Sequence, residues 1–75
     1  MRVKTLGTMR PGEGGRVLRV RGAGALRLRI LEMGLTPGAM VRVIKAAPLG
    51  DPIEVLVRGY TLSLRRADAA LVEVG

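Results

Sequence analysis

The sequence contains no cysteine and no histidine, and Tyr60 is its only aromatic residue. Without cysteine there is no disulfide framework and no thiolate chemistry, which fits a cytoplasmic setting. Without histidine a nucleophile cannot be paired with an imidazole base, so we expect no enzymatic activity. The shortage of aromatic rings argues against a groove for proline-rich ligands and against recognition of single-stranded nucleic acid by base stacking.

Long apolar runs are also missing. Hydrophobic residues make up 48% of the chain, but glycine, proline and charged residues interrupt them, so no segment approaches the roughly 20 residues of a membrane span. We expect neither a membrane span nor a signal peptide. The length of 75 residues predicts one domain, residues 1–75, with a compact core.

Positive charge is in excess, since 13 lysines and arginines stand against six carboxylates and give a formal net charge of +7. Such an excess is typical of proteins that bind nucleic acid, anionic membranes or acidic proteins. Arginines on a solvated sheet face need no partner, however, because most surface charges only interact with water. Binding of a nucleic-acid backbone by arginine therefore stays open at this point, although we do not expect it.

The remaining motifs for chemistry are weak. Asp51 and Glu54 could form a carboxylate pair, but the simpler interpretation is that Asp51 stabilises its own turn. The Gly22-Ala23-Gly24 segment has Arg27 where a dinucleotide fingerprint requires glycine, and no Gly-Lys-Ser/Thr sequence occurs for a P-loop. We interpret these glycines as turn residues.

Short apolar segments separated by glycine and proline predict a small β-barrel of about five strands. After a loop entry at 1–15, strands are expected at Arg16–Arg21, Met40–Ala46, Ile53–Arg58, Tyr60–Leu64 and Leu71–Val74, with a helical turn at 65–70. Alternation along these strands, together with the helix described next, predicts buried side chains at Ile30, Met33, Val43, Val55, Val57, Leu62 and Leu64.

Residues 25–33 fit two patterns. Leu26, Leu28 and Ile30 alternate as in a strand, whereas Leu26, Ile30 and Met33 share a helix face. Good helix formers fill the segment, and Gly34 stands where a left-handed residue would end a helix. The residues favour a helix without deciding the matter.

Three turns follow from local chemistry. Pro37 and Gly38 suit a type II turn, because proline presets φ and glycine accepts the positive φ after it. Arg58-Gly59 predicts a tight hairpin. The loop 47–52 is stiffened by Pro48 and Pro52.

Three sequence runs carry a resemblance to a known family. They are RILEMGLTPG at 29–38, APLGDPI at 47–53 and RGYTLSLR at 58–65. In this order and spacing they resemble the ferrous-iron transport accessory protein A (FeoA) family, over about residues 6–74. The resemblance implies an all-β, SH3-like barrel with a short helix inserted after the first strand, which favours the helix at 25–33.

The resemblance further implies a non-enzymatic cytoplasmic helper of the ferrous-iron permease FeoB, a membrane protein with a GTP-binding cytosolic domain. The same barrel is similar to the C-terminal domain of iron-dependent repressors, so a regulatory or nucleic-acid-associated module is the alternative. No cofactor is implied. Because ferrous sites favour imidazole and carboxylate ligands and this chain has no histidine, we also expect no iron site.

A docking surface is predicted on the helix. By the helical step of about 100° per residue, Leu28 and Leu31 lie nearly opposite the stripe of Ile30, with Arg27 and Arg29 as a basic rim. Neighbouring loops or a second copy of the chain, as a weak homo-oligomer, are the alternative cover for these leucines. The second choice of docking surface is Leu49 at the tip of the loop 47–52.

Overall fold

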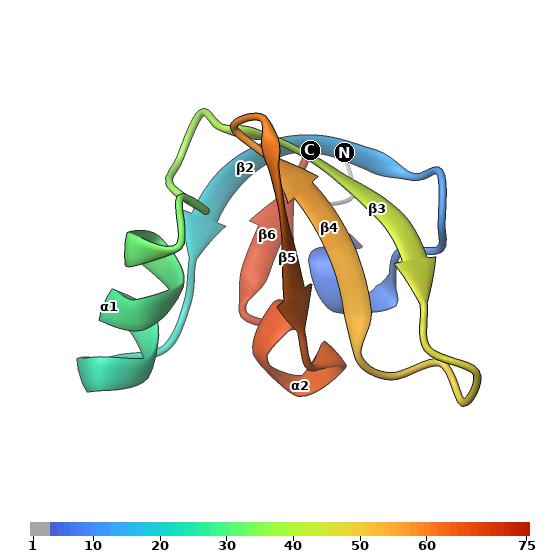
Figure 1. Ribbon diagram of the computed structural model, residues 1–75. Helices are drawn as coiled ribbons and strands as arrows, with labels where there is room; N and C mark the ends of the chain where they lie inside the picture. Colours follow the sequence, from blue (N-terminus) through green and yellow to red (C-terminus); the bar gives the residue numbers. More distant parts are fainter. Residues whose placement is uncertain (1–3) are drawn as a thin grey trace.

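A computed structural model describes residues 4–75. They form a barrel of six strands, with helix α1 at one side and helix α2 across one end (Figure 1). The elements are β1 (Lys4–Thr5), the 3-10 helix η1 (Leu6–Thr8), β2 (Gly14–Val20), α1 (Gly24–Glu32), β3 (Met40–Ala46), β4 (Ile53–Val57), β5 (Tyr60–Leu64), α2 (Arg66–Ala69) and β6 (Val72–Val74).

The strands form one sheet in the order β1-β6-β2-β3-β4-β5, and all neighbours are antiparallel. The register shifts in β2 between Val17 and Arg19, and in β3 between Val43 and Lys45. At each shift two consecutive residues are exposed, Leu18 and Arg19 in β2 and Ile44 and Lys45 in β3. Bulges of this kind bend a sheet, so the strands curl around a common interior.

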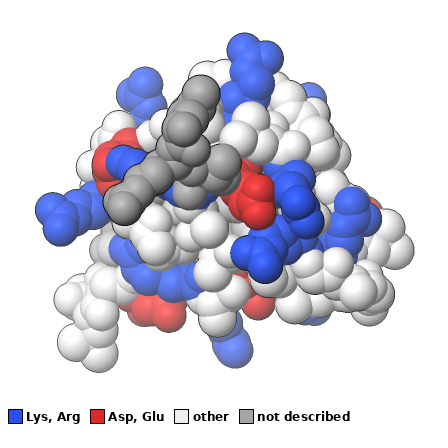
Figure 2. Space-filling view, turned by 180° about the vertical axis from the view of Figure 1, so that it is seen from behind, with Lys and Arg blue, Asp and Glu red and all other residues white. Residues whose placement is uncertain are grey.

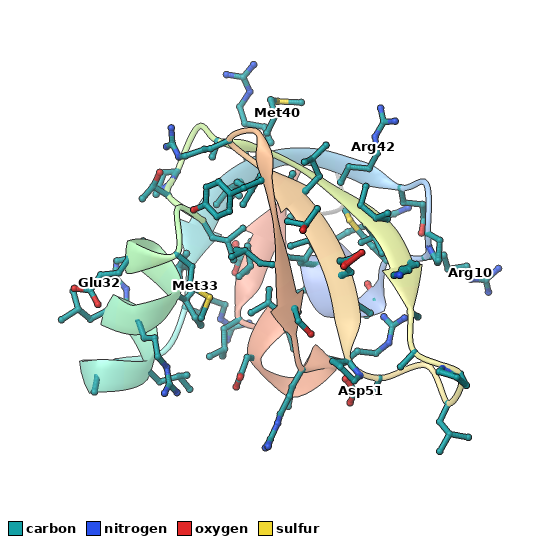
Figure 3. All side chains as sticks on the ribbon, viewed as in Figure 1. Arg10, Glu32, Met33, Met40, Arg42 and Asp51 are labelled. Carbon is teal, nitrogen blue, oxygen red and sulfur yellow. The ribbon has the colours of Figure 1, made fainter. Side chains whose placement is uncertain are left out.

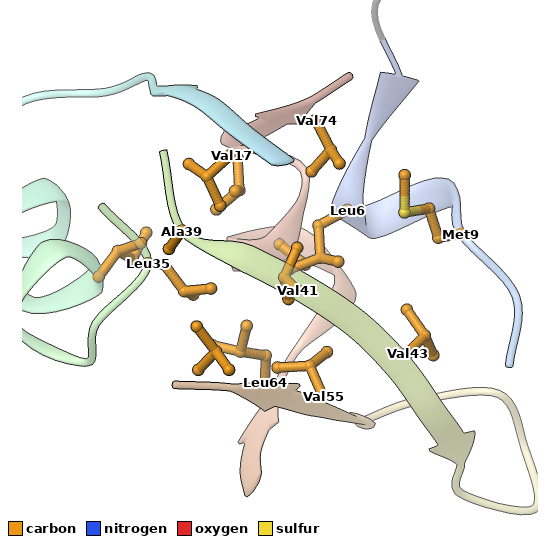
Figure 4. Packing of buried hydrophobic residues seen from close by; sticks show 14 of the residues in the cluster. Leu6, Met9, Val17, Leu35, Ala39, Val41, Val43, Val55, Leu64 and Val74 are labelled. Carbon is orange, nitrogen blue, oxygen red and sulfur yellow. The ribbon is translucent and has the colours of Figure 1, made fainter. Parts of the chain in front are cut away.

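The interior is filled by aliphatic side chains from every part of the described chain (Figure 4). They are Leu6, Met9, Val17, Val20, Ile30, Leu35, Ala39, Val41, Val43, Ile53, Val55, Val57, Leu64, Ala69, Val72 and Val74. The predicted burial of Ile30, Val43, Val55, Val57 and Leu64 is confirmed. Leu62 and Met33 are only half-buried and pack against the edge of this core.

The structure confirms the all-β class and the strands at Met40–Ala46 and Tyr60–Leu64. The expected loop at the start is partly wrong, because it contains β1 and η1, and Gly14 and Gly15 begin β2. The helix consequently follows the second strand and not the first. It ends at Glu32, one residue before the predicted end.

The predicted turns are confirmed by their backbone angles. Gly34 has φ 99° and follows the end of α1, where only glycine adopts such an angle without strain. Gly38 has φ 94°, and the Ala39 N–H donates to the Thr36 carbonyl at 3.0 Å, which closes the turn after Pro37. Arg58 and Gly59 both have positive φ, as a two-residue hairpin requires.

Candidate protein-docking site

The predicted apolar stripe on α1 is narrower than expected. Leu28 is 57% exposed, but Leu31 is half-buried and packs against the core cluster. Arg27 donates from Nε to the Val20 carbonyl at 3.1 Å, so its guanidinium ties α1 to the end of β2. The exposed face of the helix therefore presents Leu28 with Arg29 beside it, and Leu31 and Arg27 support them from the barrel side.

The C-terminal end of α1 is held by the β4–β5 hairpin. The Tyr60 hydroxyl donates to the Met33 carbonyl. Arg58 donates from Nε to the Gly34 carbonyl at 3.1 Å and from Nη2 to the Thr36 hydroxyl. These contacts satisfy carbonyl groups that a helix end leaves without partners, and they fix the hairpin against the helix.

The loop 47–52 exposes Leu49 at its tip, where the side chain is 97% accessible. Its ends are closed by Ala47 N–H donating to the Pro52 carbonyl at 2.9 Å and Gly50 N–H donating to the Ala47 carbonyl at 2.7 Å. The predicted exposure of Leu49 is therefore observed. A shallow hollow of about 270 Å³ lies beside this loop, lined in part by Pro48 and Pro52.

The sequence suggested that Asp51 stabilises its own turn, but the structure shows a different contact. Oδ1 of Asp51 accepts the Arg66 N–H at 2.9 Å and so caps the start of α2, while Glu54 forms an ion pair with Lys45 at 3.9 Å. The role of Asp51 is structural, as predicted, but it acts on a helix that is distant in the sequence. The two carboxylates have different partners and do not act as a catalytic pair.

A larger groove lies on the outer face of β2, β3 and β4 and was missed by the sequence interpretation. It has a volume of about 750 Å³ and is lined by Gly12, Gly14, Gly15, Met40, Val41, Arg42, Leu56, Val57, Arg58 and Gly59. Figure 3 shows Met40 and Arg42 towards one end of the barrel, pointing away from the interior, with Asp51 at the opposite end. The sequence did contain a signal, because inward Val41 and Val43 leave Met40, an apolar residue, on the solvent side.

The charged side chains of these surfaces are exposed or half-buried. Over the described range 4–75, no group of three acidic side chains is placed to hold a metal ion, and no ionisable side chain is buried.

The Arg10 backbone N–H donates to Glu13 at 2.7 Å and lowers the pKa of that carboxyl, with Lys4 and the Arg10 charge acting in the same direction. Within the described residues 4–75 no helix is long and apolar enough to cross a membrane.

Comparison with known proteins gives a consistent assignment. The model of the FeoA domain family matches residues 4–75. A fusion of Fe(2+) transport protein A with the Fe(2+) transporter FeoB, from Porphyromonas gingivalis, is 44% identical over 69 residues, which are 92% of this chain. The chain spans only 8% of the length of that fusion protein.

Solved structures agree with this fold. A crystal structure of the iron uptake regulatory protein FeoA has a TM-score of 0.87 at 33% identity, over 100% of this chain and 97% of that one. The zinc complex of FeoA from Stenotrophomonas maltophilia, a prokaryotic SH3 domain protein, has a TM-score of 0.83 at 28% identity, over 95% and 88% of the two chains. The barrel is therefore SH3-like, as the sequence predicted.

A manganese-dependent transcriptional repressor has the same fold in one part of its chain. Its TM-score is 0.86 at 22% identity, over 99% of this chain and 36% of that one. At this identity the likeness concerns the architecture alone.

Proposed function

Because the chain belongs to the FeoA domain family, we propose that it is a non-enzymatic accessory domain of ferrous-iron uptake. In this proposal it docks, on the cytoplasmic side, on the GTP-binding part of the ferrous-iron permease FeoB. The observation that carries the proposal is the fusion protein, in which an FeoA segment 44% identical to this chain and an FeoB transporter are parts of one polypeptide. Fusion gives two modules a high effective concentration for each other, which is useful when they act as a complex.

The proposed contact is the exposed face of α1. Leu28 would be the apolar centre and Arg29 the basic rim, an arrangement typical of specific interfaces. Leu31 and Arg27 contribute by fixing the helix to the barrel. The second choice is Leu49, because its side chain is almost fully accessible on a loop that two hydrogen bonds hold in shape.

A pull-down with the purified cytosolic domain of the cognate permease tests this function. Wild-type chain should be retained. Leu28→Asp should weaken binding by more than about tenfold, and Arg29→Ala by less, since buried apolar anchors carry most of the binding energy. Leu28 is a better target than Leu31, because an aspartate at Leu31 would also disturb the core.

Leu49→Asp is the matched variant on the other surface. If it weakens binding and Leu28→Asp does not, the contact lies on the loop 47–52. A wild-type chain that does not bind the permease domain at all contradicts the proposed function. Circular dichroism establishes that each variant is folded.

The alternative of a nucleic-acid-associated module has little support. It rests on the fold likeness to a repressor and on the net charge of +7. On the face seen in Figure 2, basic side chains are spread among acidic and uncharged groups and do not form one continuous basic surface.

A further inference from the structure

We propose that the groove on the outer face of β2, β3 and β4 binds an extended acidic segment of a partner protein. An apolar side chain of that segment would lie between Met40 and Leu56, and its carboxylates would meet Arg42 and Arg58. This site is additional to the docking surface proposed above, because none of its lining residues belongs to α1 or to the loop 47–52.

The floor of the groove is bare backbone. Gly14 lies opposite Arg42 in the register of β2 and β3. A Cβ atom at Gly14 would come within 2.3 Å of the Val41 carbonyl oxygen, so the close approach of the strands excludes any side chain there. Gly12 has φ 93° and also contributes no side chain. The hollow therefore follows from the path of the chain.

Two apolar side chains border this floor. Met40 is 59% exposed and Leu56 is 39% exposed, and both lie on the outer side of strands whose inward residues fill the core. An apolar surface of this kind beside polar groups is characteristic of a contact site. The flexible thioether of Met40 can adapt to apolar side chains of different shape.

The groove carries the positive charges of Arg42 and Arg58, which are available to pair with carboxylates of a partner. Arg42 lies between Gly14 and Leu56 in the cross-strand register, at the centre of the groove. Within residues 4–75 neither Arg42 nor Arg58 has a carboxylate at ion-pair distance, whereas Arg19, Arg21, Lys4 and Lys45 do. A partner carboxylate would supply the missing negative charge.

Arg58 is also held in place for such a contact. Its Nε and Nη2 atoms donate to the Gly34 carbonyl and the Thr36 hydroxyl. A guanidinium carries five N–H donors, so some remain for a ligand. Fixing the group beforehand reduces the side-chain entropy lost on binding.

Glu13, which lies between two glycines of the groove in the sequence, does not supply the negative charge that would pair with Arg42 and Arg58. Its carboxylate accepts the Arg10 N–H and lies 3.8 Å from the Lys4 ammonium. The apolar walls and the absence of an aromatic side chain among the lining residues favour a peptide over single-stranded nucleic acid, which binds through stacking.

Nuclear magnetic resonance titration of ¹⁵N-labelled chain tests the proposal. The probe is a synthetic peptide, acetyl-Glu-Glu-Leu-Glu-Glu-amide, and the control peptides replace every Glu by Gln or the Leu by Ala. The Glu peptide should shift the amide signals of Gly12, Gly14, Met40, Arg42, Leu56 and Arg58. The Gln peptide should bind about tenfold more weakly, since the charge contacts are lost.

Two variants and one matched control complete the test. Arg42→Glu and Met40→Ser should each weaken the affinity for the Glu peptide by about tenfold or more, whereas Arg65→Glu, at an exposed position outside the groove, should leave it unchanged. All three positions are exposed, and the dispersion of the amide spectrum shows that each variant is folded.

The proposal is overturned if millimolar Glu peptide leaves the groove signals unmoved, if the Gln peptide binds equally well, or if Arg65→Glu weakens peptide binding as much as Arg42→Glu does. It is also overturned if an oligothymidylate shifts the groove signals at lower concentration than the peptide does. The assay contains no permease, so its failure leaves the proposed FeoB contact standing, and failure of the pull-down leaves the groove standing.

Discussion

Helix α2 has four residues and helix α1 has nine, yet the shorter helix makes more polar contacts with the barrel. In α2 the Arg66 side chain donates to three backbone carbonyls, those of Gly50 at 2.6 Å, Gly7 at 2.9 Å and Met9 at 3.1 Å. Its own N–H is capped by Asp51. These contacts join segments from the start, the middle and the end of the sequence.

Helix α1 stands at the side of the barrel and has one fully buried side chain, Ile30 (Figure 1). Its polar ties are Arg27 at the start and the hairpin residues Arg58 and Tyr60 at the end. The difference indicates a division of roles. α2 closes the barrel, whereas α1 rests on it and can present an outer face to a partner without exposing the core.

The largest loss of stability is expected from a substitution that tests whether Ile30 anchors α1. Ile30→Ala should lower the free energy of unfolding by about 3 kcal/mol, because it removes a fully buried aliphatic side chain. Leu28→Ala, on the exposed side of the same helix, should change it by less than about 0.5 kcal/mol. Urea unfolding gives both values, and equal losses would mean that the helix is not held by Ile30.

A smaller loss of stability is expected from a substitution that tests whether Arg66 closes the barrel. Arg66→Gln should destabilise the protein by about 2 kcal/mol, because the carbonyls of Gly7 and Met9 lose a charged donor. Arg65→Gln is the matched control, since Arg65 is exposed and adjacent. Thermal melts of the two variants should differ clearly, and coincident melts would refute the assigned role of Arg66.

The smallest effect concerns the end of α1. Gly34→Val should cost about 1–2 kcal/mol, because a β-branched residue is strained at φ 99°. A Cβ at Gly34 would also lie 2.6 Å from the Tyr60 hydroxyl, whereas Gly38, at φ 94°, has open space. Gly38→Val should therefore cost less, about 1 kcal/mol, and a larger loss at Gly38 would show that the contact with Tyr60 is unimportant.

Local chemistry in the sequence was sufficient for strands β3 and β5 and for the turns. Val41 and Val43 alternate with exposed residues, and the positive-φ glycines Gly38 and Gly59 lie just before β3 and β5, so the boundaries of these two strands could be predicted. The helix was different, because Leu26, Leu28 and Ile30 fit two periodicities. The residue types favoured a helix, and the family resemblance was needed to decide. Strand β1 was missed because its two residues are ordered by pairing Lys4 with Val74 at the far end of the chain.

The candidate surfaces were only partly predictable for the same reason. The helical step alone placed Leu31 with Leu28, but Leu31 packs against the core, one helical turn from Arg27, which reaches the Val20 carbonyl of β2. Nothing local distinguishes Arg66 from Arg65, since the carbonyl of Gly7 is 59 residues away in sequence. The glycine floor of the groove likewise exists only once β2 and β3 have paired.

The pairing of β1 with β6 has a mechanical consequence. Lys4 lies opposite Val74 and Thr5 lies opposite Glu73, so the two ends of the described chain leave the barrel side by side (Figure 1). A force that pulls these ends apart acts first on the outermost pair and opens the ladder one bond after another. Such peeling needs much less force than shearing a whole strand along its neighbour, so tension would release β1 while the remaining strands still enclose the core.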